Sequence, residues 1–286
     1  MVESRRIETR PGLVFDVSLA GAATAPLVLM LHGFGVSRHL YDAQLPALAA
    51  AGYLGAAPNQ RGYSPGARPD PADVAQYDIA LLTADALDLA DRLGGGRRFH
   101  LVGHDWGGSL AWDIAESHPE RLASLTMLSR PHPAAFARAM AEDPGQPHRS
   151  RHHKAFLEPG AAATLLAEDC AWLRQRHAAQ HVPVAATEKH LSVLGNPAAM
   201  EAALAWYRAR RAVYRPIGPI KVPTLFIWGD EDDTVGRMAA EGTVDFVQAP
   251  YRFEVLPGVG HYAPDQMPDR VTQLLLEHLA AHPVPG

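Results

Sequence analysis

Short apolar runs alternate along the chain with longer amphipathic stretches, a pattern that predicts strands separated by helices. Residues 15–19 alternate apolar and polar positions, which is typical of an amphipathic, antiparallel strand. Later runs are apolar throughout, as expected for strands buried on both faces of a parallel sheet. These runs are residues 27–31, 53–57, 99–102, 122–128 and 224–228.

Helical patterns lie between these strands, at residues 40–51, 83–93 and 107–117. Strands that alternate with helices predict a right-handed, doubly wound α/β core with a mostly parallel sheet. A further strand at residues 251–256 and a last helix at 266–281 belong to the same pattern.

The strand–helix alternation stops after residue 128 and resumes near Val222. Residues 131–215 are rich in Ala, His, Arg and Glu, with helical periodicity and no convincing strand. Ligands of such sheets bind at the carboxyl ends of the strands, so an insertion there would cover the site and exclude water. We therefore predict a first core segment at 1–130, a helical cap at 131–215 and a second core segment at 216–286.

Composition narrows the function classes. A net charge of -5 over 286 residues leaves no basic stripe for nucleic acid. The one cysteine, Cys170, can form neither an intrachain disulfide nor a cysteine-based metal site, and it suits a reducing cytoplasm. No apolar segment resembles a signal peptide or is long enough to cross a bilayer. We expect a cytoplasmic protein with no nucleic-acid or membrane partner.

Gly103-His104-Asp105-Trp106-Gly107 follows an apolar strand and opens a helix. This is the pattern of a nucleophile elbow, in which a strained turn presents the central residue, here Asp105. The two glycines allow helix and strand to approach closely, and the helix N-terminus favours an anion. The alternative is a chance pair of glycines around an aspartate that caps a helix.

His32-Gly33-Phe34-Gly35 directly follows the strand at 27–31. A glycine-bearing turn at this place can direct backbone N–H groups into the pocket. With the elbow, we expect an oxyanion hole made by the N–H groups of Phe34 and Trp106. The alternative is ordinary turn chemistry.

Gly260-His261-Tyr262 lies between the last strand and the last helix. His261 has the place of a catalytic histidine, after the nucleophile and after an acid along the chain. The acid comes from Asp230, Asp232 or Asp233, which follow the strand at 224–228. We choose Asp232 and interpret the other two as turn residues.

Together these motifs resemble the epoxide hydrolases of the α/β-hydrolase fold over nearly the whole chain. The resemblance rests on residues 32–34, 60–63 (Gln-Arg-Gly-Tyr), 103–107, 158–160 (Glu-Pro-Gly), 206–208 (Trp-Tyr-Arg) and 260–261. It implies that Asp105 is the nucleophile, His261 the base, Asp232 its partner, and Tyr207 a cap tyrosine that hydrogen-bonds the epoxide oxygen.

On this resemblance we expect substrate contacts from His32, Trp106, Tyr207 and His152. We expect water as co-substrate, a small and largely apolar substrate, no metal, no cofactor, and a monomer or homodimer. Two positions depart from the family. Gly35 stands where the family has proline, which should loosen the turn. Counting back from residues 158–160 places His152, or His153 if the count is off by one, at the first of two cap tyrosines.

A carboxylate nucleophile limits the reaction class. Attack by Asp105 on an ester would give an anhydride, whereas attack on an epoxide or alkyl-halide carbon gives an alkyl ester that water can hydrolyse. Epoxide opening is the first hypothesis. Dehalogenation is the second, although Phe34 replaces a usual halide-binding residue and residues 107–112 contain no arginine. A third is a non-catalytic ligand-binding member of the fold.

Several other residues receive no chemical role. His177 and His181 are four apart and indicate a solvated cap helix rather than a metal site. Cys170 is interpreted as a small hydrophobic residue of the cap. Three tryptophans are interpreted as core residues: Trp112, Trp172 and Trp206.

Overall fold

The computed structural model describes residues 1–210 and 216–284, which contain an eight-stranded sheet. Its strands are β1 (Glu3–Arg10), β2 (Leu13–Ala20), β3 (Leu27–Leu31), β4 (Leu54–Pro58), β5 (Phe99–His104), β6 (Leu122–Leu128), β7 (Thr224–Gly229) and β8 (Tyr251–Leu256). The strand order is β1-β2-β4-β3-β5-β6-β7-β8. β2 pairs antiparallel with β1 and β4, and every pair from β4 to β8 is parallel. The predicted strands are therefore confirmed, including the antiparallel one.

The sheet is buried on both faces, as the apolar runs predict. Along β3, Leu27, Leu29 and Leu31 belong to one hydrophobic cluster. The intervening Val28 and Met30 belong to a second cluster. Alternate side chains of a strand point to opposite faces, so the two clusters are the two layers of the core.

The strand β1 was not predicted from the sequence. Most of its residues are exposed, and it pairs only with β2, with Arg5 opposite Val17. An edge strand has one partner and can carry charged side chains on both faces, so its sequence lacks the apolar signal of a buried strand.

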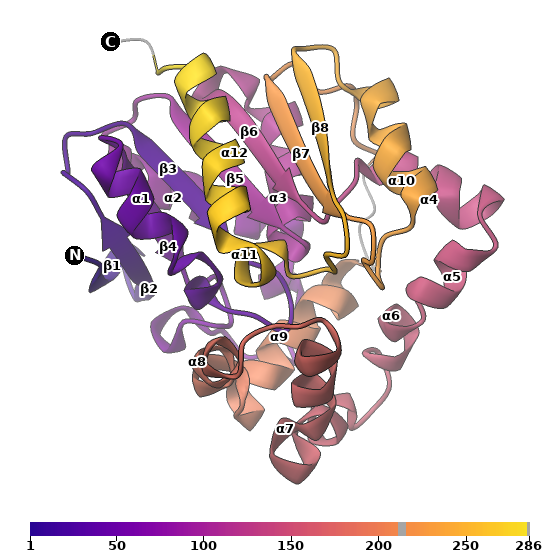
Figure 1. Cartoon of the computed structure of the whole chain (residues 1–286). Helices are drawn as coiled ribbons and strands as arrows, with labels where there is room; N and C mark the ends of the chain where they lie inside the picture. The colour runs from indigo at the N-terminus through magenta and orange to yellow at the C-terminus, as the bar shows by residue number, and fades with distance from the viewer. Residues whose placement is uncertain (211–215, 285–286) are drawn as a thin grey trace.

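Helices cover both faces of the sheet (Figure 1). The α-helices are α1 (Gln44–Ala50), α2 (Ile79–Gly94), α3 (Trp106–Ser117), α4 (Pro133–Glu142), α5 (Gly145–Arg149), α6 (His152–Ala155), α7 (Ala161–Ala179), α8 (Val184–Leu194), α9 (Pro197–Arg210), α10 (Arg237–Glu241), α11 (Ala263–Gln266) and α12 (Pro268–Ala281). The 3₁₀ helices are η1 (Arg38–Tyr41), η2 (Pro65–Ala67), η3 (Val74–Tyr77), η4 (Pro119–Arg121) and η5 (Gly242–Phe246). α1 and α12 pack together on one face, and α2 and α3 pack on the other.

Two predicted helices are interrupted. The pattern at 40–51 corresponds to η1 followed by α1. The pattern at 266–281 corresponds to the end of α11 and to α12, because Met267 leaves the helical backbone region and Pro268 opens α12. A proline is tolerated in the first turn of a helix but not in its interior.

Helices α4 to α9 connect β6 to β7, and α7, α8 and α9 gather beneath one end of the sheet (Figure 1). This is the segment that the sequence pattern predicts as a cap; residues 211–215 of it lie outside the described part. α7 is kinked, with non-helical backbone angles from Ala167 to Cys170. No helix in residues 1–210 or 216–284 has both the length and the apolar character needed to cross a membrane.

Candidate active site

Asp105 lies at the tip of a sharp turn between β5 and α3. Its φ of 49° is in the left-handed region, which a non-glycine residue occupies only at a cost. The turn is possible because glycines flank it. A Cβ on Gly103 would lie 2.7 Å from the oxygen of Gly107, and one on Gly107 would lie 2.2 Å from the oxygen of Leu31. Both glycines are therefore required for the close approach of strand and helix.

The turn after β3 packs directly against the Asp105 side chain. A Cβ on Gly33 would lie 2.4 Å from the Cβ of Asp105, so only glycine fits there. The next residue, Phe34, donates its backbone N–H to Oδ1 of Asp105 at 3.0 Å. Trp106, at the first position of α3, presents its N–H at the positive end of that helix. Oδ1 of Asp105 thus accepts one of the two N–H groups expected to form the oxyanion hole.

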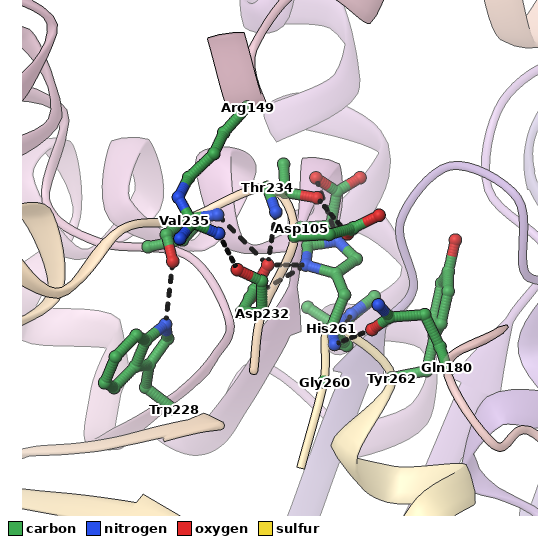
Figure 2. Close-up of polar contacts among 12 residues, drawn as sticks. Asp105, Arg149, Gln180, Trp228, Asp232, Thr234, Val235, Gly260, His261 and Tyr262 are labelled. Carbon is green, nitrogen blue, oxygen red and sulfur yellow. Dashed lines mark hydrogen bonds and ion pairs between the residues drawn. The ribbon is translucent and has the colours of Figure 1, made fainter. Parts of the chain in front are cut away.

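His261 and Asp232 complete a line of three side chains (Figure 2). Nε2 of His261 lies 3.7 Å from Oδ2 of Asp105, and Nδ1 lies 3.0 Å from Oδ2 of Asp232. Oδ1 of Asp232 also accepts the N–H groups of Thr234 at 2.7 Å and Val235 at 3.0 Å. These bonds fix the carboxylate, which in turn fixes the ring of the histidine.

Of the three aspartates considered from the sequence, only Asp232 contacts the imidazole. Asp230 accepts the N–H of Gly258 at the surface, and Asp233 pairs with Arg176 at 2.9 Å. The structure therefore brings the chosen acid to His261, and it gives the other two the turn and surface positions expected of them.

Charge balance in this buried site favours an ion pair. Burial disfavours the charged imidazole, but the charge of Asp232, with hydrogen bonds and charge from Asp105, raises the pKa of His261 to about 10. Burial likewise disfavours the Asp105 carboxylate, yet the hydrogen bond and charge of His261 hold its pKa well below the usual value. The resting site at neutral pH is an imidazolium between two carboxylates.

The cap contributes aromatic side chains above the carboxylate. Tyr207, from α9, packs edge-on against Phe34 and Trp106, with ring centroids 5.5 and 4.9 Å away. Its hydroxyl oxygen accepts a hydrogen bond from the indole N–H of Trp106. Burial, followed by the charge of Asp105, raises the pKa of Tyr207 well above its usual value. The phenol therefore stays protonated and can act as a hydrogen-bond donor.

His152, the expected replacement of a cap tyrosine, is brought to the same place. It lines a narrow cavity together with Asp105 and Tyr207, and its ring centroid lies 6.5 Å from that of Tyr207. Burial, followed by the positive charge of Arg176, lowers the pKa of His152 to about 4. His153 also approaches Tyr207, at 5.8 Å between ring centroids.

A larger cavity of about 490 Å³ adjoins the narrow one. Both are lined by His152, Phe156, Trp172 and Arg176. The volume is in the range of sites for small organic molecules. Trp172 is 38% exposed, so its interpretation as a core residue is wrong, whereas Trp112 and Trp206 are buried.

Two expectations for the turn after β3 need correction. His32 lines neither of these cavities: it is buried, its Nδ1 contacts the oxygen of Gly33, and its Nε2 accepts the N–H of Gln60. It supports the turn and does not reach a ligand there. Gly35 does more than replace a proline: with φ of 81° it adopts a conformation closed to proline, and a Cβ there would lie 3.2 Å from the hydroxyl of Tyr262 and 3.4 Å from Leu173.

The expectation for His177 is also wrong. The residue is fully buried, and its ring lies 4.9 Å from that of Tyr262 and 5.8 Å from that of His190. Its partners belong to α8 and to the loop after β8, so the local helical pattern could not reveal them. His181 is exposed, as expected, and Cys170 is buried in the cap, as expected.

Three residues near the triad escaped the sequence analysis. Gln180 accepts the N–H of His261 at 2.6 Å, and Arg149 donates to the main-chain oxygen of Asp232 at 2.6 Å. His104 contacts the main-chain oxygen of His261 through Nε2 at 2.9 Å. Gln180 and Arg149 belong to no motif, but the position of His104 directly before the nucleophile was a usable signal.

Comparison with known proteins agrees with this architecture. A family model described as the alpha/beta hydrolase fold matches residues 26–268. Epoxide hydrolase A of Mycobacterium tuberculosis is 31% identical over 96% of this chain and 97% of its own length. The crystal structure of Epoxide Hydrolase A from Mycobacterium thermoresistibile superimposes with a TM-score of 0.83 at 27% identity, with complete coverage of both chains.

A second solved structure, from work on novel epoxide hydrolases in metagenomes from hot environments, gives a TM-score of 0.85 at 28% identity. It covers 99% of this chain and 100% of the other. These similarities confirm the fold class that the sequence predicts, a mostly parallel sheet flanked by helices.

Proposed function

This chain belongs to the α/β-hydrolase family and, within it, to the epoxide hydrolases, and on that premise we propose that it opens an epoxide to a vicinal diol through a covalent ester on Asp105. The observation that carries the proposal is the unlike surroundings of the two carboxylate oxygens. Oδ1 accepts the Phe34 N–H, whereas Oδ2 faces His261. The oxygen that becomes an oxyanion needs main-chain N–H donors, such as that of Phe34 at Oδ1, whereas the oxygen that attacks the substrate must not be held by them.

In the first step, Oδ2 of Asp105 attacks a ring carbon of the epoxide and breaks its bond to the ring oxygen. The leaving alkoxide needs a proton or a strong hydrogen bond. Tyr207 is the donor, because its phenol remains protonated and its ring lies over the turn that holds Asp105. We propose His152 as the second donor. A neutral imidazole has one N–H, which must leave its hydrogen bond with the main chain of Arg149 to reach the alkoxide. The product is an alkyl ester of Asp105, whose carbonyl oxygen is Oδ1.

In the second step, His261 takes a proton from water, and the hydroxide attacks the ester carbonyl carbon. The negative charge develops on Oδ1, where the N–H groups of Phe34 and Trp106 stabilise it. The bond from the carbonyl carbon to the alkyl oxygen then breaks, and that oxygen takes the proton from His261 and leaves as the diol. The new carboxylic acid of Asp105 returns a proton to His261, which restores the resting site. Asp232 orients His261 and stabilises the imidazolium that forms.

The timing of the base follows from the charges. In the resting site two carboxylates raise the pKa of His261 to about 10, so the ring holds its proton. Formation of the ester removes the charge of Asp105, which lowers the pKa of His261. The imidazolium then releases a proton, which balances the one that the alkoxide takes from Tyr207, and the neutral histidine is the base for the second step.

The substrate is a small molecule with a largely apolar body, because aromatic side chains dominate the walls around Asp105. Phe34, Phe156, Trp172 and Tyr207 line the narrow cavity. Dehalogenation has less support, since the indole of Trp106 is engaged with the hydroxyl of Tyr207 and is not directed at a halide site. We propose that the protein acts in the cytoplasm, as a monomer or a homodimer.

A single-turnover reaction in water enriched in heavy oxygen tests the covalent route. With enzyme in excess over an aryl epoxide such as styrene oxide, the first diol should carry only ordinary oxygen, and the label should enter Asp105. Mass measurement of diol and of the peptide containing Asp105 reports both. Label in the first diol would mean direct attack by water and would refute the covalent ester.

A further inference from the structure

Both main-chain polar groups of His261 are held by side chains, and Figure 2 shows the one from Gln180. Its N–H donates to Oε1 of Gln180 at 2.6 Å, and its carbonyl oxygen accepts from Nε2 of His104 at 2.9 Å. His104 belongs to the core, directly before Asp105, whereas Gln180 belongs to the helical segment between β6 and β7. The histidine is therefore clamped between two parts of the chain.

Gln180 is itself firmly placed. It follows the last residue of α7, and its N–H bonds to the carbonyl oxygens of Arg176 and His177, each at 3.1 Å. Its amide oxygen lies directly against Gly260, because a Cβ on that glycine would be 1.8 Å from Oε1. The absence of a side chain at 260 is what lets the glutamine reach the N–H of His261.

One turn earlier, on α7, Arg176 binds residues that follow His261 and Asp232 in the chain. Its Nε donates to the hydroxyl of Tyr262 at 3.0 Å. Its Nη2 reaches Asp233 and Thr234, both at 2.9 Å. The end of α7 thus contacts the loop of the histidine and the loop of the acid together, from two residues four positions apart, Arg176 and Gln180.

The loop that carries His261 needs such support. Gly258 has φ of 70°, and Gly260 has no side chain to pack, so the backbone between β8 and α11 has unusual conformational freedom. Within the core, Gln266 accepts the N–H of Gly260 at 3.0 Å, but among residues 1–210 and 216–284 the acceptor for the N–H of His261 is Gln180 alone.

We propose that Gln180 is a positioning residue for His261, which sets the imidazole against Asp105 and Asp232 and couples docking of the cap to activation of water. This inference rests on the proposed function. A displacement of the ring by about 1 Å would cost on the order of 10²-fold in the step that uses it. That step is hydrolysis of the ester, whereas alkylation by Asp105 does not require the base.

Three variants separate positioning from a general structural role. Gln180→Met keeps the length of the side chain and removes the acceptor. Gln180→Glu keeps an acceptor at the same reach. Gln175→Met is the matched control, because Gln175 is an exposed glutamine on the same helix.

The first measurement needs no substrate. Amide hydrogen exchange at His261 and the proton resonance of its Nδ1–H report the position of the loop and its bond to Asp232. In Gln180→Met we expect exchange faster by roughly tenfold or more and a displaced or broadened resonance. Gln180→Glu and Gln175→Met should resemble wild type. Unchanged values in Gln180→Met would overturn the proposal.

The second measurement resolves the two steps by stopped flow and intact-protein mass, with an epoxide that wild type turns over. Gln180→Met should hydrolyse the ester about 10²-fold more slowly, so that the ester accumulates, with alkylation changed less than about twofold. Gln180→Glu should recover most of the rate, and its hydrolysis profile should move to higher pH, because the added carboxylate raises the pKa of His261.

Equal losses in both steps would assign Gln180 to general stability and overturn the proposal, as would an unchanged hydrolysis rate. If wild type formed no ester with any epoxide, the proposed function would fail instead. The exchange and resonance measurements would then still decide whether Gln180 positions His261, so the two failures are distinguishable.

Discussion

The imidazole Nε2 of His261 lies 3.7 Å from Oδ2 of Asp105. Burial disfavours both charged forms, but the charge of Asp232, together with the hydrogen bond and charge of Asp105, raises the pKa of the histidine to about 10, and the histidine in turn depresses the pKa of Asp105. Loss of the Asp105 charge should therefore lower the pKa of His261. We expect a lower value in Asp105→Asn than in wild type, measured by NMR titration of the His261 ring. An equal pKa in the two proteins would contradict the coupling.

The same coupling predicts unlike pH dependence for the two steps. The ester has no charge at residue 105, so the pKa of His261 in that state is below its resting value, and hydrolysis should accelerate as pH rises through it. Alkylation needs the Asp105 carboxylate, whose pKa lies well below the usual value, and should be flat over the same range. Rapid-quench measurement of ester formation and decay between about pH 6 and 9 checks both slopes.

His261→Gln should separate the steps. Glutamine cannot accept the proton of water, so hydrolysis should fall by roughly 10²- to 10⁴-fold while alkylation continues. Intact-protein mass should then show enzyme that retains the mass of one substrate. His118→Gln is the control, because His118 is an exposed histidine whose partner is Glu120. Absence of an adduct in His261→Gln, with a substrate that wild type consumes, would exclude its role as base.

Asp232→Asn should give the same defect in a weaker form. The amide cannot stabilise the imidazolium and offers one oxygen where the carboxylate has two, so His261 loses both orientation and basicity. We expect slower ester hydrolysis with alkylation retained. Asp230→Asn is the matched control, since the side chain of Asp230 accepts the N–H of Gly258 and lies at the surface. A defect in the control equal to that of Asp232→Asn would argue against the assignment.

The core could be predicted from the sequence because its strands are buried on both faces. Runs such as residues 27–31 are apolar throughout, and this signal is local. The edge strand β1 was missed because a strand exposed on both faces lacks this apolar signal. The elbow motif was also local in the sequence, although only Gly103 is required by contacts within the turn, whereas Gly107 is required by the main chain of Leu31 and His32.

The supports of the site could not be predicted in the same way. Gln180 and Arg149 act on main-chain atoms of residues that lie 81 and 83 positions away, so no spacing or residue type marks them. His177 was misassigned for a related reason. Its helix is rich in alanine and charged residues, which suggests a solvated helix. The ring is nevertheless buried by residues from other elements, and the periodicity of one helix cannot show such contacts.

Tyr207→Phe tests the proton donor. The change removes one hydroxyl and keeps the ring that packs against Phe34 and Trp106. Alkylation should slow by roughly 10²- to 10⁴-fold, and hydrolysis of a preformed ester should change little. Tyr53→Phe is the control, because Tyr53 lies directly before β4, far along the chain from the cap. An unchanged alkylation rate in Tyr207→Phe would require another donor.

His152 gives the last prediction. An unperturbed histidine titrates near ~6.5, and an imidazolium there would accelerate alkylation in mildly acidic solution. Burial, followed by the charge of Arg176, instead lowers the pKa of His152 to about 4, so the ring is neutral and donates at most one hydrogen bond. We therefore expect no rise in the alkylation rate between about pH 7.5 and 5.5 in wild type, measured by stopped flow.

His152→Phe should slow alkylation at every pH, and His152→Tyr should restore it. His153→Phe is the control for position, since that ring also approaches Tyr207. A wild-type rate that rises near pH ~6.5 and loses this rise in His152→Phe would mean that the ring is charged. Equal rates in His152→Phe and wild type would leave Tyr207 as the sole donor.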